Sequence, residues 1–271
     1  GVKIIDTRSD EARIKLEEYG DLLYKKRNRR GVTKYEARKI MRSRNYFGSM
    51  MVENGEADAL ITGVTRKYKD SIRPSLQIIG VDEKIGKLAG MYLVLTKNYG
   101  PYFFADTTIN QNPSAEDLAD IALLTHKAVK EFNIEPRIAM LSYSNFGSVE
   151  GKGPDKVIEA VKTLHKNHPK MIVDGDIQAN FAVNPTLLNE QFPFSKLNGK
   201  RANTLIFPNL SSGNISYKLL QQMGDLEVIG PVLLGMNKSV HIMQLGASVR
   251  EIVNMTTLAV VDAQVKQTKK S

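Results

Sequence analysis

Short apolar segments alternate with longer amphipathic segments along most of this 271-residue chain. Gly, Pro, Asn or Asp bound the apolar segments, which lie at residues 59–64, 88–96, 102–106, 137–143, 171–174, 204–208 and 228–234. Parallel strands need a long crossover, usually a helix, so this alternation is typical of α/β folds. The pattern therefore predicts an α/β protein whose sheet is mainly parallel.

The amphipathic segments predict the helices. Apolar residues recur at helical spacing in residues 11–26, 33–54, 114–132, 154–167, 214–223 and from 248 onward. Thr33 and Glu36 have the spacing of a capping box, in which each side chain satisfies a free backbone N–H of the first helical turn. Ser248 and Glu251 repeat that spacing at the last helix.

Composition limits the classes of partner. The 38 Lys and Arg residues exceed the 29 Asp and Glu residues, and a dense basic cluster lies at residues 25–30. No nucleic-acid motif or interleaved aromatic platform accompanies that cluster, so the pattern favours a solvated basic face over nucleic-acid binding. There is no cysteine, no apolar run of about 18 residues and no signal peptide, so we expect no disulfide and no membrane span, and a cytoplasmic location.

Small polar residues follow several predicted strands, at 62–63, 141–148 and 207–214. In open α/β sheets ligands bind beyond the carboxyl ends of the strands, although Ser, Gly and Asn are also good turn residues. No Walker loop, GxGxxG, HExxH or GxSxG motif is present. His165 and His168 have a spacing that a metal could use, but no carboxylate cluster accompanies them, so no metal site is predicted.

Ten blocks, in order along the chain, resemble the phosphate acetyltransferase family: residues 24–33, 55–59, 71–79, 104–106, 112–114, 141–144, 147–148, 174–178, 207–210 and 213–218. The resemblance implies two α/β domains with mainly parallel sheets and a cleft between them, like isocitrate and isopropylmalate dehydrogenases. It places residues 1–100 with 236–271 in one subdomain and 101–235 in the other. Family members normally carry more sequence ahead of this start, so we expect the N-terminal part of the fold to be missing.

The resemblance also implies binding residues. Arg27 and Arg73 match two arginines that hold acetyl phosphate in the family, and guanidinium groups pair well with phosphate. Arg27 could instead belong to the solvated basic face, and Arg73 could be a positive cap beside Pro74 in a turn. The remaining residues expected to bind acetyl-CoA or phosphate are Ser142, Tyr143, Ser144, Asn214, Lys218 and Gln244.

Residues 244–251 depart from the pattern of active relatives. Those relatives have a Ser-Arg pair where this chain has Gln244 and Leu245, and an Asp that acts as base towards the CoA thiol where it has Glu251. Losing one preorganised donor typically costs about 2.7–4 kcal/mol in the barrier. Glu251 could still act as a base, but its spacing to Ser248 favours a capping role. Asn180-Phe181 also departs, where active relatives tend to have an aspartate.

The end of the chain resembles one branch of the family. Residues 239–243 and 252–264 are similar to the phosphotransacetylase-like domain fused to many bacterial malic enzymes. This resemblance predicts a non-catalytic regulatory domain with acetyl-CoA as effector, acting on a separate malic-enzyme catalytic domain that uses NAD(P) and Mg or Mn. It also implies a homo-oligomer, at least a dimer.

Two alternatives stay open. One is an active phosphate acetyltransferase that moves an acetyl group between acetyl phosphate and CoA. The other is a purely oligomerising role, for which Ile252, Met255 and Leu258 are candidates, although these apolar residues also fit an ordinary core.

Overall fold

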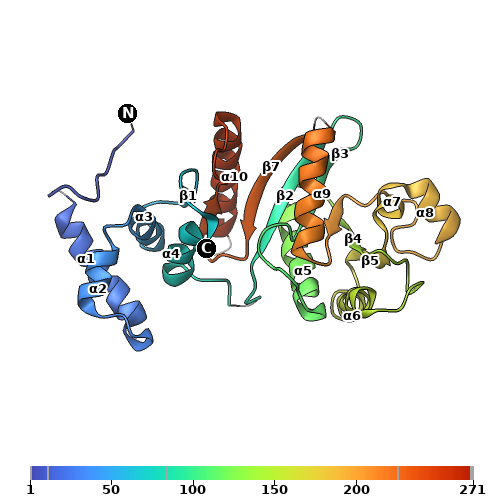
Figure 1. Ribbon diagram of the computed structural model, residues 1–271, viewed down its shortest axis with the longest axis horizontal. Helices are drawn as coiled ribbons and strands as arrows, with labels where there is room; N and C mark the ends of the chain where they lie inside the picture. Colours follow the sequence, from blue (N-terminus) through green and yellow to red (C-terminus); the bar gives the residue numbers. More distant parts are fainter. Residues whose placement is uncertain (1, 11, 84, 225, 269–271) are drawn as a thin grey trace. The chain divides into compact units, whose positions relative to one another are not determined.

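The computed structural model describes residues 2–10, 12–83, 85–224 and 226–268. The chain divides into two compact units (Figure 1). The first unit comprises Gly1–Asp82 and Met236–Ser271, and the second comprises Glu83–Gly235. Residues 83–100, which the sequence assigned to the first subdomain, lie in the second unit because their strand pairs within its sheet.

The second unit is built on a six-stranded mixed sheet with the order β5-β4-β6-β3-β2-β7. β5, β4, β6 and β3 run parallel, whereas β2 is antiparallel to both of its neighbours. The strands are β2 (Ala89–Thr96), β3 (Gly100–Ala105), β4 (Arg137–Leu141), β5 (Ile172–Ile177), β6 (Thr204–Ile206) and β7 (Glu227–Leu234). The prediction of a mainly parallel sheet is therefore confirmed.

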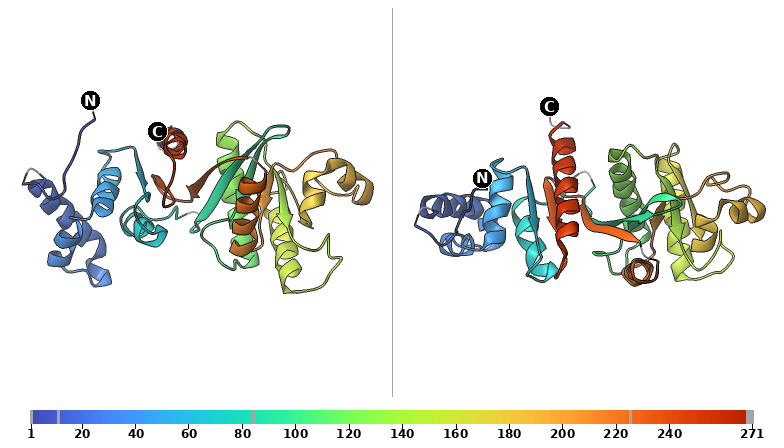
Figure 2. Two further views of the ribbon diagram at one scale, coloured as in Figure 1. Left: turned by 45° about the horizontal axis from the view of Figure 1, so that its top comes forward. Right: turned by 90° about the horizontal axis from the view of Figure 1, so that it is seen from above.

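Helices cover both faces of this sheet. α5 (Ala115–Glu131) and α6 (Lys152–Asn167) lie on one face and α9 (Leu210–Met223) on the other (Figure 2). The short helices α7 (Ala179–Val183) and α8 (Pro185–Gln191) follow β5. α5 begins with a capping box between Ser114 and Asp117 and buries an apolar face that includes Leu118, Ile121 and Val129. Both faces are covered, and this explains why the strands read as near-continuous apolar runs.

The first unit contains a two-stranded parallel sheet, β1 (Ala59–Thr62) with β8 (Ser239–Ile242). The sheet joins the beginning of the unit to its end, because 176 residues separate Thr62 and Ser239 in sequence. The described residues of the unit also form six helical segments: α1 (Arg13–Arg27), η1 (Asn28–Arg30), α2 (Lys34–Ile40), α3 (Arg44–Glu53), α4 (Tyr68–Ile78) and α10 (Val249–Thr268).

Two helices differ from the sequence prediction. The single helix expected from Thr33 towards Asn54 is broken at residues 41–43, since Ser43 takes an extended conformation with ψ of 124°. α4 was not predicted at all, because Pro74 was interpreted as a turn residue. Its buried residues Ser71, Pro74, Ser75 and Ile78 nevertheless recur at helical spacing.

The remaining differences are short elements. β8, α7 and α8 were not predicted, since each has only four to seven residues and little periodicity. The predicted start of the first helix at Glu11 lies outside the described residues. Over the described ranges, no helix combines the length and the apolar content that crossing a bilayer requires.

Candidate functional site

Arg27, a predicted phosphate ligand, is the last residue of α1. Its side chain is half-buried, whereas the neighbouring Lys25, Lys26, Arg29 and Arg30 are exposed. The Nε of Arg27 is buried and has no hydrogen-bond partner among the described residues. A buried guanidinium nitrogen without a partner is costly, so an anion placed there would gain a charge-assisted hydrogen bond.

Arg73, the second predicted phosphate ligand, lies in the interior of α4 and is exposed. The alternative of a positive cap in a turn is therefore wrong, because Arg73 and Pro74 are both helical residues. Pro74 and Ser75 are buried on the inner face of α4. The helix thus holds Arg73 on its outer side, where the guanidinium can meet a ligand.

Tyr46 on α3 links the two arginines. Its hydroxyl donates a hydrogen bond to Gln77 Oε1 at 2.6 Å. Burial raises the pKa of Tyr46, and the positive charges of Arg73 and Arg27 act in the opposite direction. Both guanidinium groups therefore lie close enough to the Tyr46 hydroxyl to act on it electrostatically. Arg27 and Arg73 thus both lie in the first unit, near Tyr46.

Sequence reasoning did not identify Tyr46 or Gln77. Gln77 follows Arg73 by four residues, so the two share one face of a helix. That spacing could have indicated Gln77, but only if residues 68–78 had first been interpreted as a helix.

The loop after β8 carries Gln244 and Leu245. Both residues are exposed, Leu245 at 61%. The backbone N–H of Met243 donates to the Thr62 carbonyl at 2.6 Å, which joins this loop to the end of β1. Gly63 makes the close approach possible: it has a φ of 119°, and a Cβ there would lie 2.1 Å from the Met243 carbonyl oxygen. The loop thus presents an exposed apolar side chain at the position where the resemblance implies an arginine in active relatives.

Glu251 forms the predicted capping box with Ser248. Its Oε2 accepts hydrogen bonds from the Ser248 N–H at 2.7 Å and the Ser248 hydroxyl at 2.8 Å. The Glu251 N–H in turn donates to Ser248 Oγ at 3.2 Å. The capping interpretation is confirmed, and Oε2 carries two hydrogen bonds that a proton acceptor would have to share.

In the second unit, the other predicted residues lie at one edge of the sheet. β3, β4 and β6 are parallel, so the loops that follow them emerge at the same edge. Ser142, Tyr143 and Ser144 follow β4, and α9 with Asn214 and Lys218 follows β6. Asn214 Nδ2 donates to the Thr107 carbonyl in the loop after β3 at 3.3 Å. The three loops thus form one edge of the kind where α/β folds bind ligands.

The two serine hydroxyls at this edge are engaged within their own loop. Ser142 Oγ accepts the Ser144 N–H at 3.2 Å, and Ser144 Oγ accepts the Val149 N–H at 3.1 Å. Ser144 is fully buried, while the Tyr143 side chain is 62% exposed and Lys218 is also exposed. The structure therefore leaves Tyr143 and Lys218 accessible and uses the serines to hold the loop.

Asp106 is a further buried carboxylate at the same edge. Its Oδ1 accepts backbone N–H groups of Gly90, Thr108 and Ile109 at 2.8 to 3.1 Å. Its Oδ2 accepts the Asn110 N–H at 2.8 Å. These bonds hold residues 106–110 in one conformation. Asp106 therefore has a structural role, which accounts for the sequence block around it without a reactive carboxylate.

These features define an α/β protein with two arginines near Tyr46 in one unit and a polar strand edge in the other. The model of the phosphate acetyl/butaryl transferase family matches residues 1–260, so the chain belongs to that family.

Relatives named phosphate acetyltransferase match over most of both chains. That of Bacillus subtilis is 36% identical, over 97% of this chain and 80% of its own length. A crystal structure of a phosphotransacetylase from Streptococcus pyogenes is 35% identical, with a TM-score of 0.84, and covers 98% of this chain and 78% of its own. The EutD phosphotransacetylase from Staphylococcus aureus is 31% identical, also with a TM-score of 0.84.

Malic enzymes match equally well over this chain. The NADP-dependent malic enzyme of Escherichia coli is 37% identical over 97% of this chain, but the match spans only 34% of that protein. The family is thus shown, and the comparisons do not single out the malic-enzyme branch that the sequence favoured. The likeness to dehydrogenases and the missing N-terminal part stay predictions.

Proposed function

We propose that this chain binds acetyl phosphate and CoA as phosphate acetyltransferases do, and acetyl transfer between them is the activity that the comparisons support best. The supporting relatives match across at least three quarters of their own length. In the transfer, the CoA sulfur forms a bond to the acetyl carbon while the bond from that carbon to the phosphate oxygen breaks. Inorganic phosphate leaves with the bonding electron pair, and the thiol proton goes to a base, for which Glu251 is the candidate.

The observation that carries this proposal is the half-buried Arg27, whose Nε has no hydrogen-bond partner among the described residues, in the same unit as the exposed Arg73 on α4. Two guanidinium groups can share the charge of a phosphoryl group, which the Tyr46 hydroxyl can also contact. The unpartnered Arg27 Nε supplies a donor that no described protein group uses. Such donors stabilise a leaving phosphate in the transition state as well as the bound acetyl phosphate.

A second candidate function is favoured by residues 244–251. The exposed Leu245 cannot stabilise charge on a reacting oxygen, and Glu251 is engaged by Ser248. These features support a domain that binds acetyl-CoA without turning it over. In this candidate the domain regulates a malic-enzyme catalytic domain that uses NAD(P) and Mg or Mn, within a homo-oligomer that is at least a dimer.

One paired measurement separates the two candidates. The purified chain is titrated calorimetrically with acetyl-CoA, and CoA-dependent turnover of acetyl phosphate is assayed on the same sample. Turnover that Glu251→Gln abolishes supports the transferase. Saturable acetyl-CoA binding without turnover supports the regulatory domain, and absence of both binding and turnover contradicts both candidates.

A second arm tests the missing arginine directly. Leu245→Arg restores the side chain that active relatives carry. If the arginine is the missing element, this variant gains turnover by about a hundredfold or more. An unchanged rate in Leu245→Arg would show that the departure at this position does not limit catalysis.

A further inference from the structure

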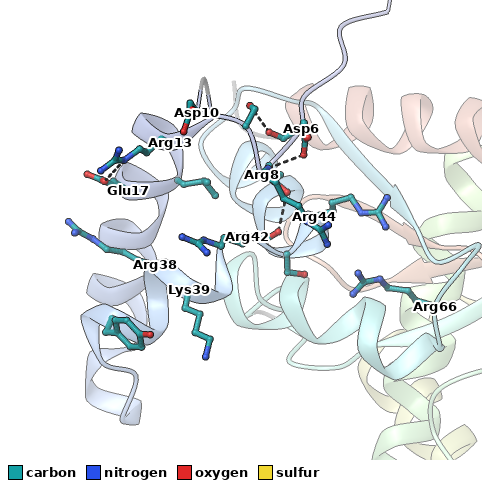
Figure 3. Close-up of a pocket in the computed structure, with 15 residues that line it drawn as sticks. Asp6, Arg8, Asp10, Arg13, Glu17, Arg38, Lys39, Arg42, Arg44 and Arg66 are labelled. Atoms are coloured by element: carbon teal, nitrogen blue, oxygen red, sulfur yellow. Dashed lines mark hydrogen bonds and ion pairs between the residues drawn. The ribbon is translucent and has the colours of Figure 1, made fainter.

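A second basic feature lies in the first unit, in a groove of about 1300 Å³ lined by residues from positions 6 to 66 (Figure 3). Neither Arg27 nor Arg73 lines it. Its walls come from the segment before α1, from α1 and α2, from the break before α3 and from the loop after β1. Seven of the lining residues are cationic and three are acidic, so the groove is strongly positive.

Most of these cations have no carboxylate to balance them. Arg13 pairs with Glu17 at 3.7 Å, and Arg38 pairs with Asp21, with Nε to Oδ1 at 3.0 Å. The other five form no ion pair with a described residue: Arg8, Lys39, Arg42, Arg44 and Arg66.

Elsewhere in the first unit several cations have carboxylate partners, although Lys25, Arg29 and Arg30 form no ion pair with a described residue. There, Lys15 pairs with Glu56, Lys26 with Glu53 and Lys266 with Asp262. A surface that serves only for solubility normally intersperses charges of both signs in this way. Five unbalanced cations around one groove repel one another, and an anionic ligand would remove that repulsion.

The beginning of α3 adds a local argument. Arg44 is the first residue of α3, where the helix dipole disfavours a positive charge. Ser43, the N-cap residue, makes no side-chain capping bond, and the first turn contains no acidic residue. Helical preference therefore does not account for Arg44, whereas a phosphate between Arg44 and Arg42 would suit both the dipole and the guanidinium groups.

We propose that this groove binds the clustered phosphate groups of a polyphosphorylated small molecule. Arg8, Arg44 and Arg66 arise from three different segments around the groove and can contact separate phosphates (Figure 3). The source of those phosphates is either the nucleotide end of CoA, with its diphosphate and 3′-phosphate, or a separate nucleotide. Binding at the groove does not depend on acetyl transfer.

The test is calorimetric titration of the chain with CoA, dephospho-CoA, ATP and inorganic phosphate. The double variant Arg42→Gln/Arg44→Gln should weaken binding of CoA or ATP by about tenfold or more, since charge-assisted hydrogen bonds are lost. The matched control Lys127→Gln/Lys130→Gln removes two exposed cations from α5 and should change affinity by less than about twofold. Binding should also weaken as salt is raised.

The arms separate the sources of the phosphates. Loss of affinity in dephospho-CoA points to the nucleotide end of CoA, while ATP binding that the groove variant weakens points to a separate nucleotide. The proposal is overturned if neither CoA nor ATP binds, if the groove variant binds both as the parent does, or if the control loses as much affinity as the groove variant.

The same variants keep this proposal distinct from the proposed function. Arg42→Gln/Arg44→Gln should leave acetyl phosphate affinity within about twofold, because neither residue contacts the Arg27 and Arg73 pair in any described interaction. Arg73→Gln should have the opposite pattern, with weaker acetyl phosphate binding and unchanged ATP binding.

Discussion

The arginines around Tyr46 and the serines after β4 were both predicted to bind the same ligand, but their polar atoms are in different states. Arg27 Nε is buried and has no hydrogen-bond partner in the part of the chain that the structure describes, and the Arg73 side chain is exposed on α4. Ser142 Oγ and Ser144 Oγ instead accept backbone N–H groups of their own loop. The region of the two arginines therefore has a donor available for a ligand, whereas the loop after β4 uses its serine oxygens to stabilise its own conformation.

This difference teaches that a shared motif resemblance does not give its residues a shared role. An unpartnered buried donor gains free energy when a ligand arrives, whereas a hydroxyl oxygen that accepts a backbone N–H already stabilises the free protein and keeps only its O–H for a ligand. Substitutions in the two regions should therefore affect different measurements: ligand affinity in the first and unfolding free energy in the second.

The largest expected effect is on acetyl phosphate binding in Arg73→Gln. Loss of a charge-assisted hydrogen bond to the phosphate should weaken binding by about 10- to 100-fold, since such bonds contribute about 1.5–3 kcal/mol. Calorimetric or competition titration measures the change. Arg30→Gln, which removes an exposed arginine from the adjacent basic cluster, should have less than about a twofold effect. Equal losses in the two variants would mean that only overall charge matters.

Ser144→Ala should act on stability instead. The variant removes the hydrogen bonds of the buried Ser144 hydroxyl to the Val149 N–H and the Ser148 hydroxyl, and a typical hydrogen bond contributes about 0.5–1.5 kcal/mol. Urea unfolding measures this loss, and acetyl phosphate affinity should stay at the parent value. Ser211→Ala, at an exposed position near the start of α9, is the matched control. If the variant is as stable as the parent but binds acetyl phosphate poorly, Ser144 contributes to ligand binding instead of stability.

Ser248→Ala tests the same distinction at Glu251. Removal of the N-cap hydroxyl should lower the free energy of unfolding by about 1 kcal/mol. Ser248→Thr keeps a hydroxyl and should retain most of the stability. If Ser248→Ala also raises acetyl phosphate turnover, the hydrogen bonds from Ser248 lower the ability of the Glu251 carboxylate to act as a base. Stability loss alone would leave Glu251 with a structural role.

The smallest expected effect is that of Tyr46→Phe. This change removes the donor to Gln77 Oε1 and should lower the free energy of unfolding by about 0.5–1.5 kcal/mol. Because the hydroxyl lies near both arginines, affinity for acetyl phosphate should also fall by a few fold. Tyr35→Phe, at a side chain that is 75% exposed, should change neither quantity. An unchanged affinity in Tyr46→Phe would restrict Tyr46 to a packing role.

Sequence reasoning predicted much of the fold because its strongest signals are local. All seven predicted strands exist, with boundaries shifted by up to three residues, since apolar runs bounded by turn residues need no tertiary information. The Thr33–Glu36 and Ser248–Glu251 capping boxes were also predicted correctly, because each depends only on residues three apart.

The errors occur where local signals conflict with packing. Pro74 opposes a helix, yet α4 forms because Ser71, Pro74, Ser75 and Ile78 bury one common face. β8 is only four residues long, and its existence depends on pairing with β1. The boundary between the units shifted for the same reason, because β2 pairs with strands that are distant in sequence.

The sequence by itself determined the α/β class and the family and predicted a role for the two arginines, since ordered blocks and periodicity are properties of the chain alone. Only the tertiary structure decided that Tyr46 bonds to Gln77 near those arginines and that the oxygens of Ser142 and Ser144 accept N–H groups of their own loop. It also decided that five cations of the groove have no carboxylate partner among the described residues. The physical reason is that partners and burial are created by folding. The residue type determines which hydrogen bonds a side chain can form. Its neighbours in the folded protein determine whether those hydrogen bonds are already made or remain available to a ligand.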